Sequence, residues 1–228
     1  MRITARLAAS LVLAAAPVSE TAAAVIDVPV TPLVVRIYDA PALAPPQDQS
    51  ALREAQAILA EAGIAPEWVA CASGAAAARC TIPLAGAELA VRVITAPPQP
   101  HSARLPLGYS LVDGRTRSGA LATVYLDRVQ WLAAAATADV AALLGRAIAH
   151  EIGHLLLGSP RHGPFGVMRA TWSRQLVRDS RANEWRFSVH EAKQMRAAVS
   201  ARRAPDATAA PVEAGAWQGG AGSQTNAQ

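Results

Sequence analysis

The sequence predicts a single α+β domain, and three observations support that fold class. The first is length, because 228 residues with 52% hydrophobic residues supply one sizeable core and little material for a second. The second is the order of periodic segments, which is strand, helix, four strands and two helices, with no internal repeat. The third is physical, since helices layered on a sheet bury the apolar faces of both kinds of element.

The amino-terminal half of the predicted domain places one helix among short strands. The β-branched run at residues 33–38 predicts the first strand. Residues 49–62 carry apolar side chains at helical spacing, and Gly63 follows as a helix stop. Short segments at 67–71 and 88–95 predict the second and third strands, the latter with clear alternation.

The next segments predict a hairpin followed by a long helix. Residues 107–112 and 122–129 are the fourth and fifth strands, joined by a turn rich in Gly, Asp and Ser. Thr137 or Asp139 can cap the first turn of the helix, because either side chain accepts a hydrogen bond from a free backbone N–H. Gly158 is expected to end that helix.

A last helix is predicted at 188–202, and it closes the domain. Its apolar face is expected to contain Val189, Ala192, Met195 and Val199. From Ala204 onward the chain consists largely of Ala, Gly, Pro, Gln and Ser, a composition that predicts a disordered tail at 204–228. The folded domain is therefore expected to span residues 25–203.

Residues 1–24 have the features of a secretory signal peptide. Arg2 and Arg6 precede a ten-residue apolar run, which is short for a membrane span, and a run of alanines ends at Ala24. We expect cleavage after Ala24, with an uncleaved anchoring helix as the alternative. Beyond it, we expect no stable membrane span and a secreted or periplasmic location.

Export would determine the state of the two cysteines. Cys71 and Cys80 enclose a short alanine-rich segment, and in an oxidising compartment such a pair forms a disulfide. Two free thiols are the alternative. A metal site at these cysteines is not expected, because the CxxC spacing is absent.

Charge and aromatic content argue against a nucleic-acid partner. The formal net charge is +4, from 21 basic and 17 acidic residues, but the arginines are scattered rather than clustered. Aromatic residues make up only 4% of the chain, too few for a base-stacking platform.

The residues best suited to chemistry lie between positions 150 and 168. His150, Glu151 and His154 form an HExxH motif inside the long predicted helix, and the i, i+4 spacing puts both imidazoles on one face. Such a pair can bind one Zn²⁺ ion while Glu151 stays free to act as a general base. Zinc in a catalytic site needs a third protein ligand, and His162, beyond the stop at Gly158, is the leading candidate.

The stretch from His150 to His162 resembles the metzincin clan of zinc metallopeptidases. The usual pattern is HExxHxxGxxH, whereas here the glycine is one residue late and the third histidine two residues late. Gly166-Val167-Met168 is similar to the methionine turn of that clan, which implies that Met168 lies beneath the metal. The resemblance also implies a mixed, mostly parallel sheet, an active-site helix, a C-terminal helix, and an edge strand at 107–112 that pairs with an extended peptide.

A different third ligand would make the site similar to the thermolysin-like group. In that group a glutamate from a later helix completes the site, and Glu184 and Glu191 are the candidates here, with Asp179 a weaker one.

The sequence therefore predicts a secreted zinc-dependent metalloendopeptidase with a peptide or protein substrate. The alternatives are a non-catalytic exported protein with a structural zinc or none, and a zinc amidase that acts on cell-wall peptide. Because the three histidines must be neutral to bind metal, activity is expected to fall at acid pH. The oligomeric state and cleavage preference stay open.

Overall fold

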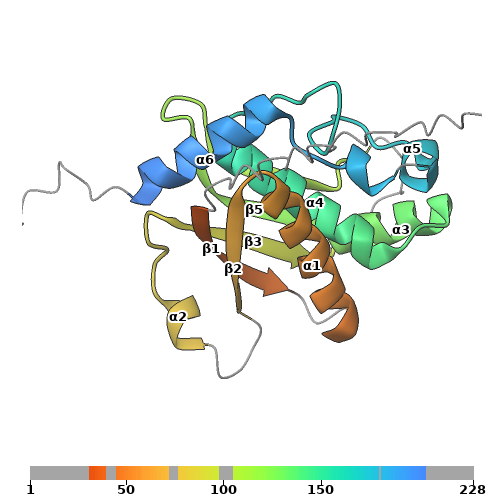
Figure 1. The fold of residues 1–228 in the computed structure, drawn as a ribbon. Coiled ribbons are helices and arrows are strands. Elements are labelled where there is room, and N and C mark those ends of the chain that lie inside the picture. Colours follow the sequence, from red (N-terminus) through yellow and green to blue (C-terminus); the bar gives the residue numbers. More distant parts are fainter. Residues whose placement is uncertain (1–30, 40–44, 72–76, 98–104, 180, 204–228) are drawn as a thin grey trace, which may run out of the picture.

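A computed structural model describes residues 31–39, 45–71, 77–97, 105–179 and 181–203 of the chain. The predicted signal peptide and the predicted tail lie outside these ranges. Within them the fold is α+β, with one mixed sheet and helices packed mainly on one side of it, as the sequence predicted (Figure 1).

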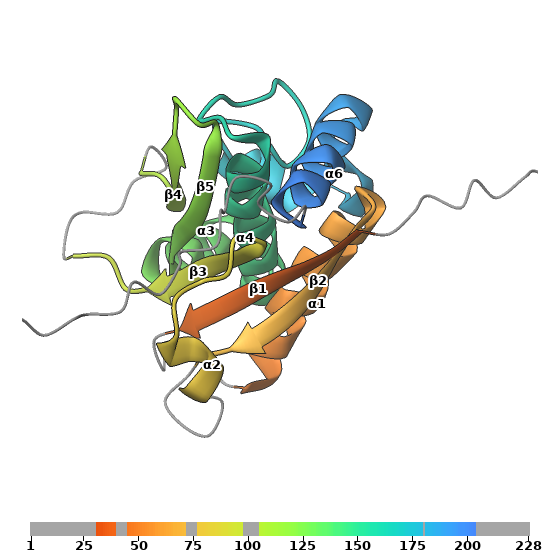
Figure 2. The same cartoon turned by 90° about the vertical axis from the view of Figure 1, so that its left-hand side faces the viewer.

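The sheet has five strands in the order β2-β1-β3-β5-β4 (Figure 2). Their bounds are β1 Thr31–Asp39, β2 Ile64–Ala70, β3 Glu88–Ile94, β4 Gly108–Asp113 and β5 Ser118–Tyr125. All neighbouring pairs are parallel except β4 with β5, which forms an antiparallel hairpin with a register shift between Leu111 and Val112. The predicted strand at 107–112 is thus the edge strand β4.

Six helices and one 3-10 turn accompany the sheet in the part of the chain that the structure describes. They are α1 Pro45–Glu61, α2 Ala77–Thr81, α3 Leu126–Ala136, α4 Val140–Leu157, α5 Arg174–Asp179, the turn η1 Ala182–Glu184, and α6 Val189–Arg203. Helices α1 and α4 pack against each other, and α4 lies along β5 and β4. Helix α6 crosses the top of α4 (Figure 1).

The core lies between the sheet and helices α1 and α4. Alternate residues of β1 (Leu33, Val35 and Ile37) and of β3 (Leu89, Val91 and Val93) are all within 5% exposure. Helix α4 is buried along most of its length, with Leu144, Ile148, Ile152 and Leu155 among its core residues. Because α4 is central, the residues of the HExxH motif are held on a rigid element.

Two local expectations were wrong. Residues 126–129 begin helix α3 instead of continuing the fifth strand. Val189 is 89% exposed, while Ala192, Met195 and Val199 of α6 are buried. Ser188 and Glu191 explain the exposure: each side chain accepts a hydrogen bond from the other residue's backbone N–H, a capping box that puts Val189 in the first turn, away from the core.

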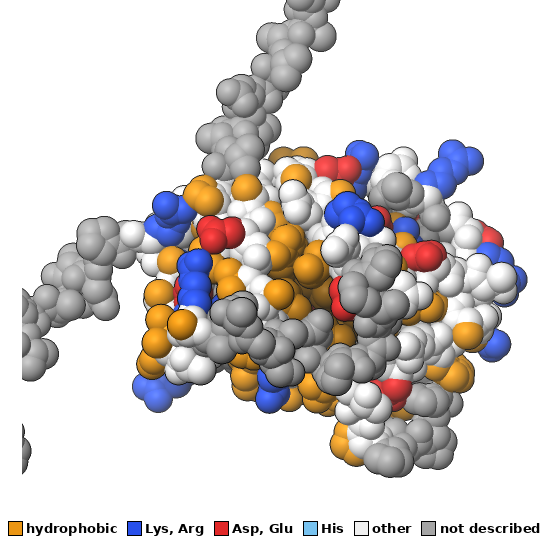
Figure 3. Space-filling model, turned by 90° about the horizontal axis from the view of Figure 1, so that it is seen from below, with side chains coloured by type: hydrophobic (Ala, Val, Ile, Leu, Met, Phe, Trp, Pro, Cys, Tyr) orange, Lys and Arg blue, Asp and Glu red, His pale blue; other side chains and the backbone are white. Residues whose placement is uncertain are grey.

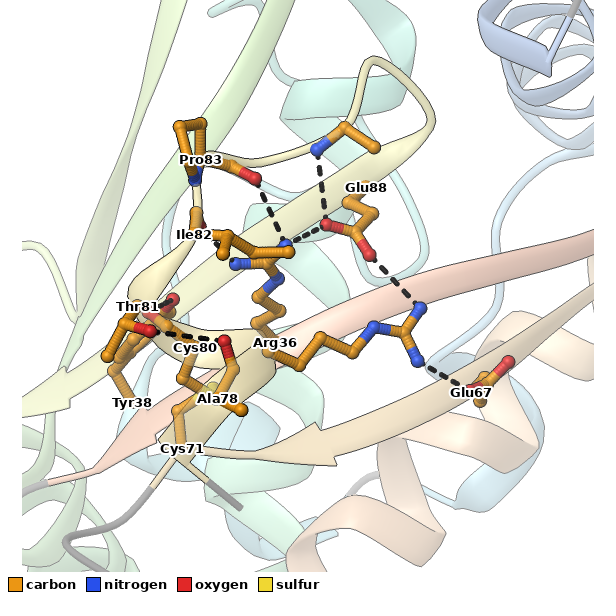
Figure 4. Close-up of polar contacts among 12 residues, drawn as sticks. Arg36, Tyr38, Glu67, Cys71, Ala78, Cys80, Thr81, Ile82, Pro83 and Glu88 are labelled. Carbon is orange, nitrogen blue, oxygen red and sulfur yellow. Dashed lines mark hydrogen bonds and ion pairs between the residues drawn. A yellow bond between two sulfur atoms is a disulfide. The ribbon is translucent and has the colours of Figure 1, made fainter.

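On the opposite side of the sheet, a buried arginine connects β1 to the segment that follows α2 (Figure 4). Arg36 is 1% exposed and donates hydrogen bonds to the carbonyl oxygens of Ile82 and Pro83 and to the Glu88 carboxylate. Burial raises the pKa of Glu88, but hydrogen bonds from the Ala85 N–H, Arg36 and Arg79 together hold it below its ordinary value. The paired carboxylate and guanidinium make burial of two charges tolerable.

The predicted disulfide between Cys71 and Cys80 is present beside this cluster, and it joins the end of β2 to α2. No described cysteine is free. A disulfide of this kind fits an oxidising, extracellular environment.

The surface seen from below has apolar side chains near its centre and charged side chains scattered around them (Figure 3). Among the described helices, α4 is long and apolar enough to cross a membrane by length and composition alone, with a mean hydropathy of 1.3. However, 72% of that segment is buried inside the fold, so its apolar character is explained by its place in the core.

Candidate metal centre

Helix α4 presents the three motif residues because its two ends are well defined. The Asp139 side chain accepts a hydrogen bond from the Ala142 N–H at 2.7 Å, so Asp139, not Thr137, caps the helix. The helix ends at Gly158, whose φ of +59° is the left-handed conformation that glycine adopts without strain. His150, Glu151 and His154 are all buried, at 9%, 5% and 5% exposure.

The chain turns back after Gly158 and brings His162 to the other two histidines. The Nε2 atom of His154 lies 3.0 Å from that of His150 and 3.2 Å from that of His162. Three nitrogens held by one tetrahedral zinc ion, with bonds of about 2.0–2.1 Å, lie about 3.3 Å from one another. Both separations from His154 are close to that value, and the ligand atoms of all three histidines lie within 4.8 Å of one another, so the group can share one metal ion.

Hydrogen bonds at the other ring nitrogens indicate how the imidazoles are protonated. His150 Nδ1 lies 2.8 Å from the carbonyl oxygen of Val167, and His154 Nδ1 lies 2.8 Å from that of Ser159. A carbonyl oxygen only accepts, so both Nδ1 atoms donate and both neutral rings direct an Nε2 lone pair at the cluster. Lone pairs facing one another repel, and a shared cation relieves that repulsion.

Burial also keeps these histidines neutral. Loss of hydration lowers the pKa of His150 to about 3, with smaller contributions from the other two histidines, against the hydrogen bond to Val167 that raises it. Burial likewise lowers the pKa values of His154 and His162. Neutral imidazoles are available to a metal without prior loss of a proton, so the donor set fits a divalent cation.

Glu151 is placed for proton chemistry and is contacted from the edge strand. Burial raises the pKa of its carboxyl group to about 7, and a hydrogen bond from Ser110 on β4 opposes that shift. The Ser110 Oγ lies 2.7 Å from Glu151 Oε2 and 2.8 Å from the Glu151 carbonyl oxygen. On the same strand Gly108 leaves room for the carboxylate, since a Cβ there would lie 2.7 Å from Oε1.

A second layer of apolar side chains supports the histidines. Met168 is fully buried and packs against Gly153, where a Cβ would lie 2.6 Å from its sulfur atom. Trp172 is 8% exposed and meets His150 edge-on, with ring centroids 5.6 Å apart. Trp172 in turn meets Trp185 edge-on, so His150, Trp172 and Trp185 form a continuous series of edge-to-face ring contacts.

These elements surround a cavity of about 270 Å³. Its walls contain the three histidines and Glu151 from α4 and the following loop, together with a stretch of β4. They also contain residues that follow the methionine: Arg169, Ala170 and Trp172. The cavity is mostly apolar with a few convergent polar groups, as ligand sites usually are.

The alternative third ligands do not join the cluster. Glu191 uses its carboxylate to cap α6, and Glu184 is exposed in η1. Among the described residues, the group whose ligand atoms converge consists of His150, His154 and His162, without a carboxylate. Asp179, at the exposed end of α5, is also absent from it.

Sequence reasoning missed several residues of the cavity. Ser110 was part of a predicted strand, but its contact with Glu151 depends on strand register and so has no local signal. Trp172 is buried in the core and also lines the cavity. Arg169 directly follows Met168, which was expected beneath the metal. That adjacency was a signal in the sequence that Arg169 lies near the site.

Comparison with known proteins adds no family assignment, since no protein-family model and no curated protein matches this chain. The chain has a group of three histidines that could hold a metal ion. Its α+β fold is compatible with that of a zincin.

Proposed function

We propose that this protein is an exported zinc-dependent peptidase of the metzincin type. The observation that carries the proposal is the convergence of three Nε2 atoms in a cavity that also contains a buried carboxylate, Glu151. A structural zinc site is closed by four protein ligands, whereas a catalytic one keeps a position open. Three histidine ligands, one of them exposed, favour the catalytic kind.

Each residue has a separate task in this proposal. His150, His154 and His162 would hold the ion through Nε2, and three imidazole ligands suit zinc. A bound zinc ion supplies Lewis acidity, which lowers the pKa of water toward 7 and polarises a carbonyl group. Glu151 takes a proton from the attacking water and delivers it to the leaving amine nitrogen. Burial raises the pKa of this carboxyl group to about 7 in the metal-free protein, and a bound cation would shift it toward the carboxylate form that a general base requires.

The substrate is proposed to be an extended peptide. Strand β4 is the edge of the described sheet beyond β5, and its residues 108–110 line the cavity. An edge strand offers unpaired backbone groups to a peptide, which would place a substrate amide beside Glu151. Because an edge strand pairs with an extended peptide backbone, we propose a peptide bond as the target. The peptide of a bacterial-type cell wall is one class of substrate that contains such bonds.

The first experiment measures metal content and hydrolysis in the same preparations. Wild-type protein should contain one zinc ion per chain by elemental analysis, and His162→Ala should lose most of it. His190→Ala is the matched control, because His190 is exposed and outside the cavity. Full zinc retention in His162→Ala would contradict the three-histidine site.

Hydrolysis is then followed by mass spectrometry on a mixed peptide library. We expect Glu151→Gln to retain zinc and to lose hydrolysis by at least about a hundredfold, the range of general acid–base catalysis. Zinc binding with no hydrolysis of any peptide by the wild type would support the non-catalytic alternative. Unchanged hydrolysis by Glu151→Gln would remove its role as the base.

A further inference from the structure

The wall of the cavity includes an arginine that the proposed reaction does not use, and the same residue also lines a neighbouring pocket beside Glu184. Arg169 directly follows Met168 and lies in the wall of the cavity, half-buried. The guanidinium forms no hydrogen bond or ion pair with any residue that the structure describes. A half-buried arginine without a counter-charge is ready to bind an anion, and its planar fork suits a carboxylate.

The backbone holds Arg169 at this place. Gly163 and Arg169 form a parallel bridge, and the Gly163 N–H donates to the Met168 carbonyl oxygen at 2.8 Å. That pairing fixes the start of the Arg169 side chain beside the loop that carries His162. A residue anchored this way loses little backbone entropy when a ligand binds.

The charges around the cavity favour the same kind of ligand. Its described wall has two formally charged side chains, Glu151 and Arg169, besides the three histidines proposed as metal ligands. With a divalent ion on the histidines, the cavity carries a net positive charge. Such a cavity attracts anionic groups and repels basic ones.

We infer that Arg169 is a specificity-determining residue that binds a carboxylate of the substrate near the bond to be cleaved. The inference rests on the proposed peptidase function and adds a substrate class to it: peptides with an acidic side chain or a free carboxy terminus close to that bond. Both sources offer the same chemistry, and matched peptides separate them.

The test uses two pairs of octapeptides on the zinc-loaded protein. One pair, both amidated, differs only in a central Asp or Asn; the other differs only in a free or amidated carboxy terminus. Wild type should favour one carboxylate peptide by about tenfold in kcat/KM, the effect of one charge-assisted hydrogen bond. Which pair shows the preference identifies the source.

Variants assign the preference to this side chain. Arg169→Gln should reduce the selectivity ratio about tenfold, and Arg169→Lys should restore part of it, because the charge remains but the fork does not. The control is Arg174→Gln, an exposed arginine nearby that does not line the cavity, which should leave the ratio unchanged. An equal preference in wild type and Arg169→Gln would overturn the inference and assign the carboxylate to the metal.

Calorimetric binding of the same peptides to zinc-loaded Glu151→Gln provides a readout that does not need turnover. We expect the carboxylate peptide to bind about tenfold more tightly, and the additional Arg169→Gln change to remove that difference. If no peptide is hydrolysed but this difference is present, the peptidase proposal fails and carboxylate binding stands. If hydrolysis occurs without any carboxylate preference, the peptidase stands and the role of Arg169 is excluded.

Discussion

At the scale of single residues, the pair formed by Glu151 and Ser110 is the most informative. The Ser110 hydroxyl lies within hydrogen-bond distance of both the carboxylate and the backbone oxygen of Glu151. It therefore fixes the side chain of the proposed base against the backbone of its own helix. Ser110 is a positioning residue in this arrangement, since it acts through Glu151.

Replacing Ser110 with alanine should slow the reaction and leave the metal in place. We expect kcat to fall about tenfold with KM nearly unchanged, because one hydrogen bond to a charged group is lost while the peptide contacts remain. Ser110→Thr retains a hydroxyl and should recover part of the rate. The exposed Ser118→Ala, in the same hairpin, is the control. A zinc content that falls in parallel with kcat would contradict a positioning role.

The burial of Glu151 has a consequence for stability in metal-free protein. Its pKa rises from 4.5 to about 7 on folding. The contribution of this carboxyl group to the stability of the folded state is therefore fully present below pH 4.5 and is lost as the pH rises through 7. From pH 4 to pH 8, the free energy of unfolding of Glu151→Gln should therefore improve relative to wild type by about 3 kcal/mol.

Urea unfolding of chelator-treated protein at the two pH values measures this difference. The histidine contributions are common to both proteins and cancel in the comparison. Glu184→Gln, at an exposed glutamate, is the control substitution. If the free energies of unfolding of wild type and Glu151→Gln differed by the same amount at pH 4 and at pH 8, the Glu151 carboxyl group would not be desolvated.

At the scale of secondary-structure elements, α4 determines the geometry of the site because it carries two of the three histidines and Glu151. Its first turn depends on the Asp139 side chain. Asp139→Ala should lower the free energy of unfolding by about 1 kcal/mol, and Asp139→Asn, which also caps well, by much less. Urea unfolding measures both. The cap lies well over two turns before His150, so Asp139→Ala should keep its zinc at low denaturant concentration. A loss of zinc there would show that the helix is less rigid than its burial implies.

Elements with strong local signals were predictable, and those that depend on tertiary contacts were not. The strand pattern, Gly63, the Asp139 cap and Gly158 all express preferences of a few neighbouring residues. The start of α3 does not, because residues 122–129 contain no glycine or proline to separate strand from helix.

The site shows the same division. The three histidines were recognisable because helix periodicity and a short loop bring them together within 13 residues. Ser110 is 41 residues from Glu151, and only the position of β4 beside α4 reveals the contact. Local sequence identified the proposed metal ligands, whereas the contacts of the base required the structure.

At the scale of the whole molecule, the disulfide and the Arg36 cluster stabilise the side of the sheet away from the cavity. Replacing both cysteines with serine should lower the free energy of unfolding by about 2–3 kcal/mol, the entropy gained by the unfolded chain when a short loop is released. None of the described residues of that loop lines the cavity, so zinc content and hydrolysis at low temperature should not change. Thermal unfolding with and without reductant checks the first expectation. A parallel loss of zinc would reveal coupling between the two ends of the molecule.

The proposed metal ligands lie between residues 150 and 162, whereas the side chain that contacts Glu151 comes from β4. The proposed ligands belong to one short continuous stretch, so a loss of the pairing between β4 and β5 would leave them together. Glu151 would then lose Ser110 and the edge that aligns a peptide. A preparation could thus contain a full complement of zinc and yet be largely dormant. The number of competent molecules should therefore be counted by titration with a tight-binding inhibitor, and not inferred from the metal content.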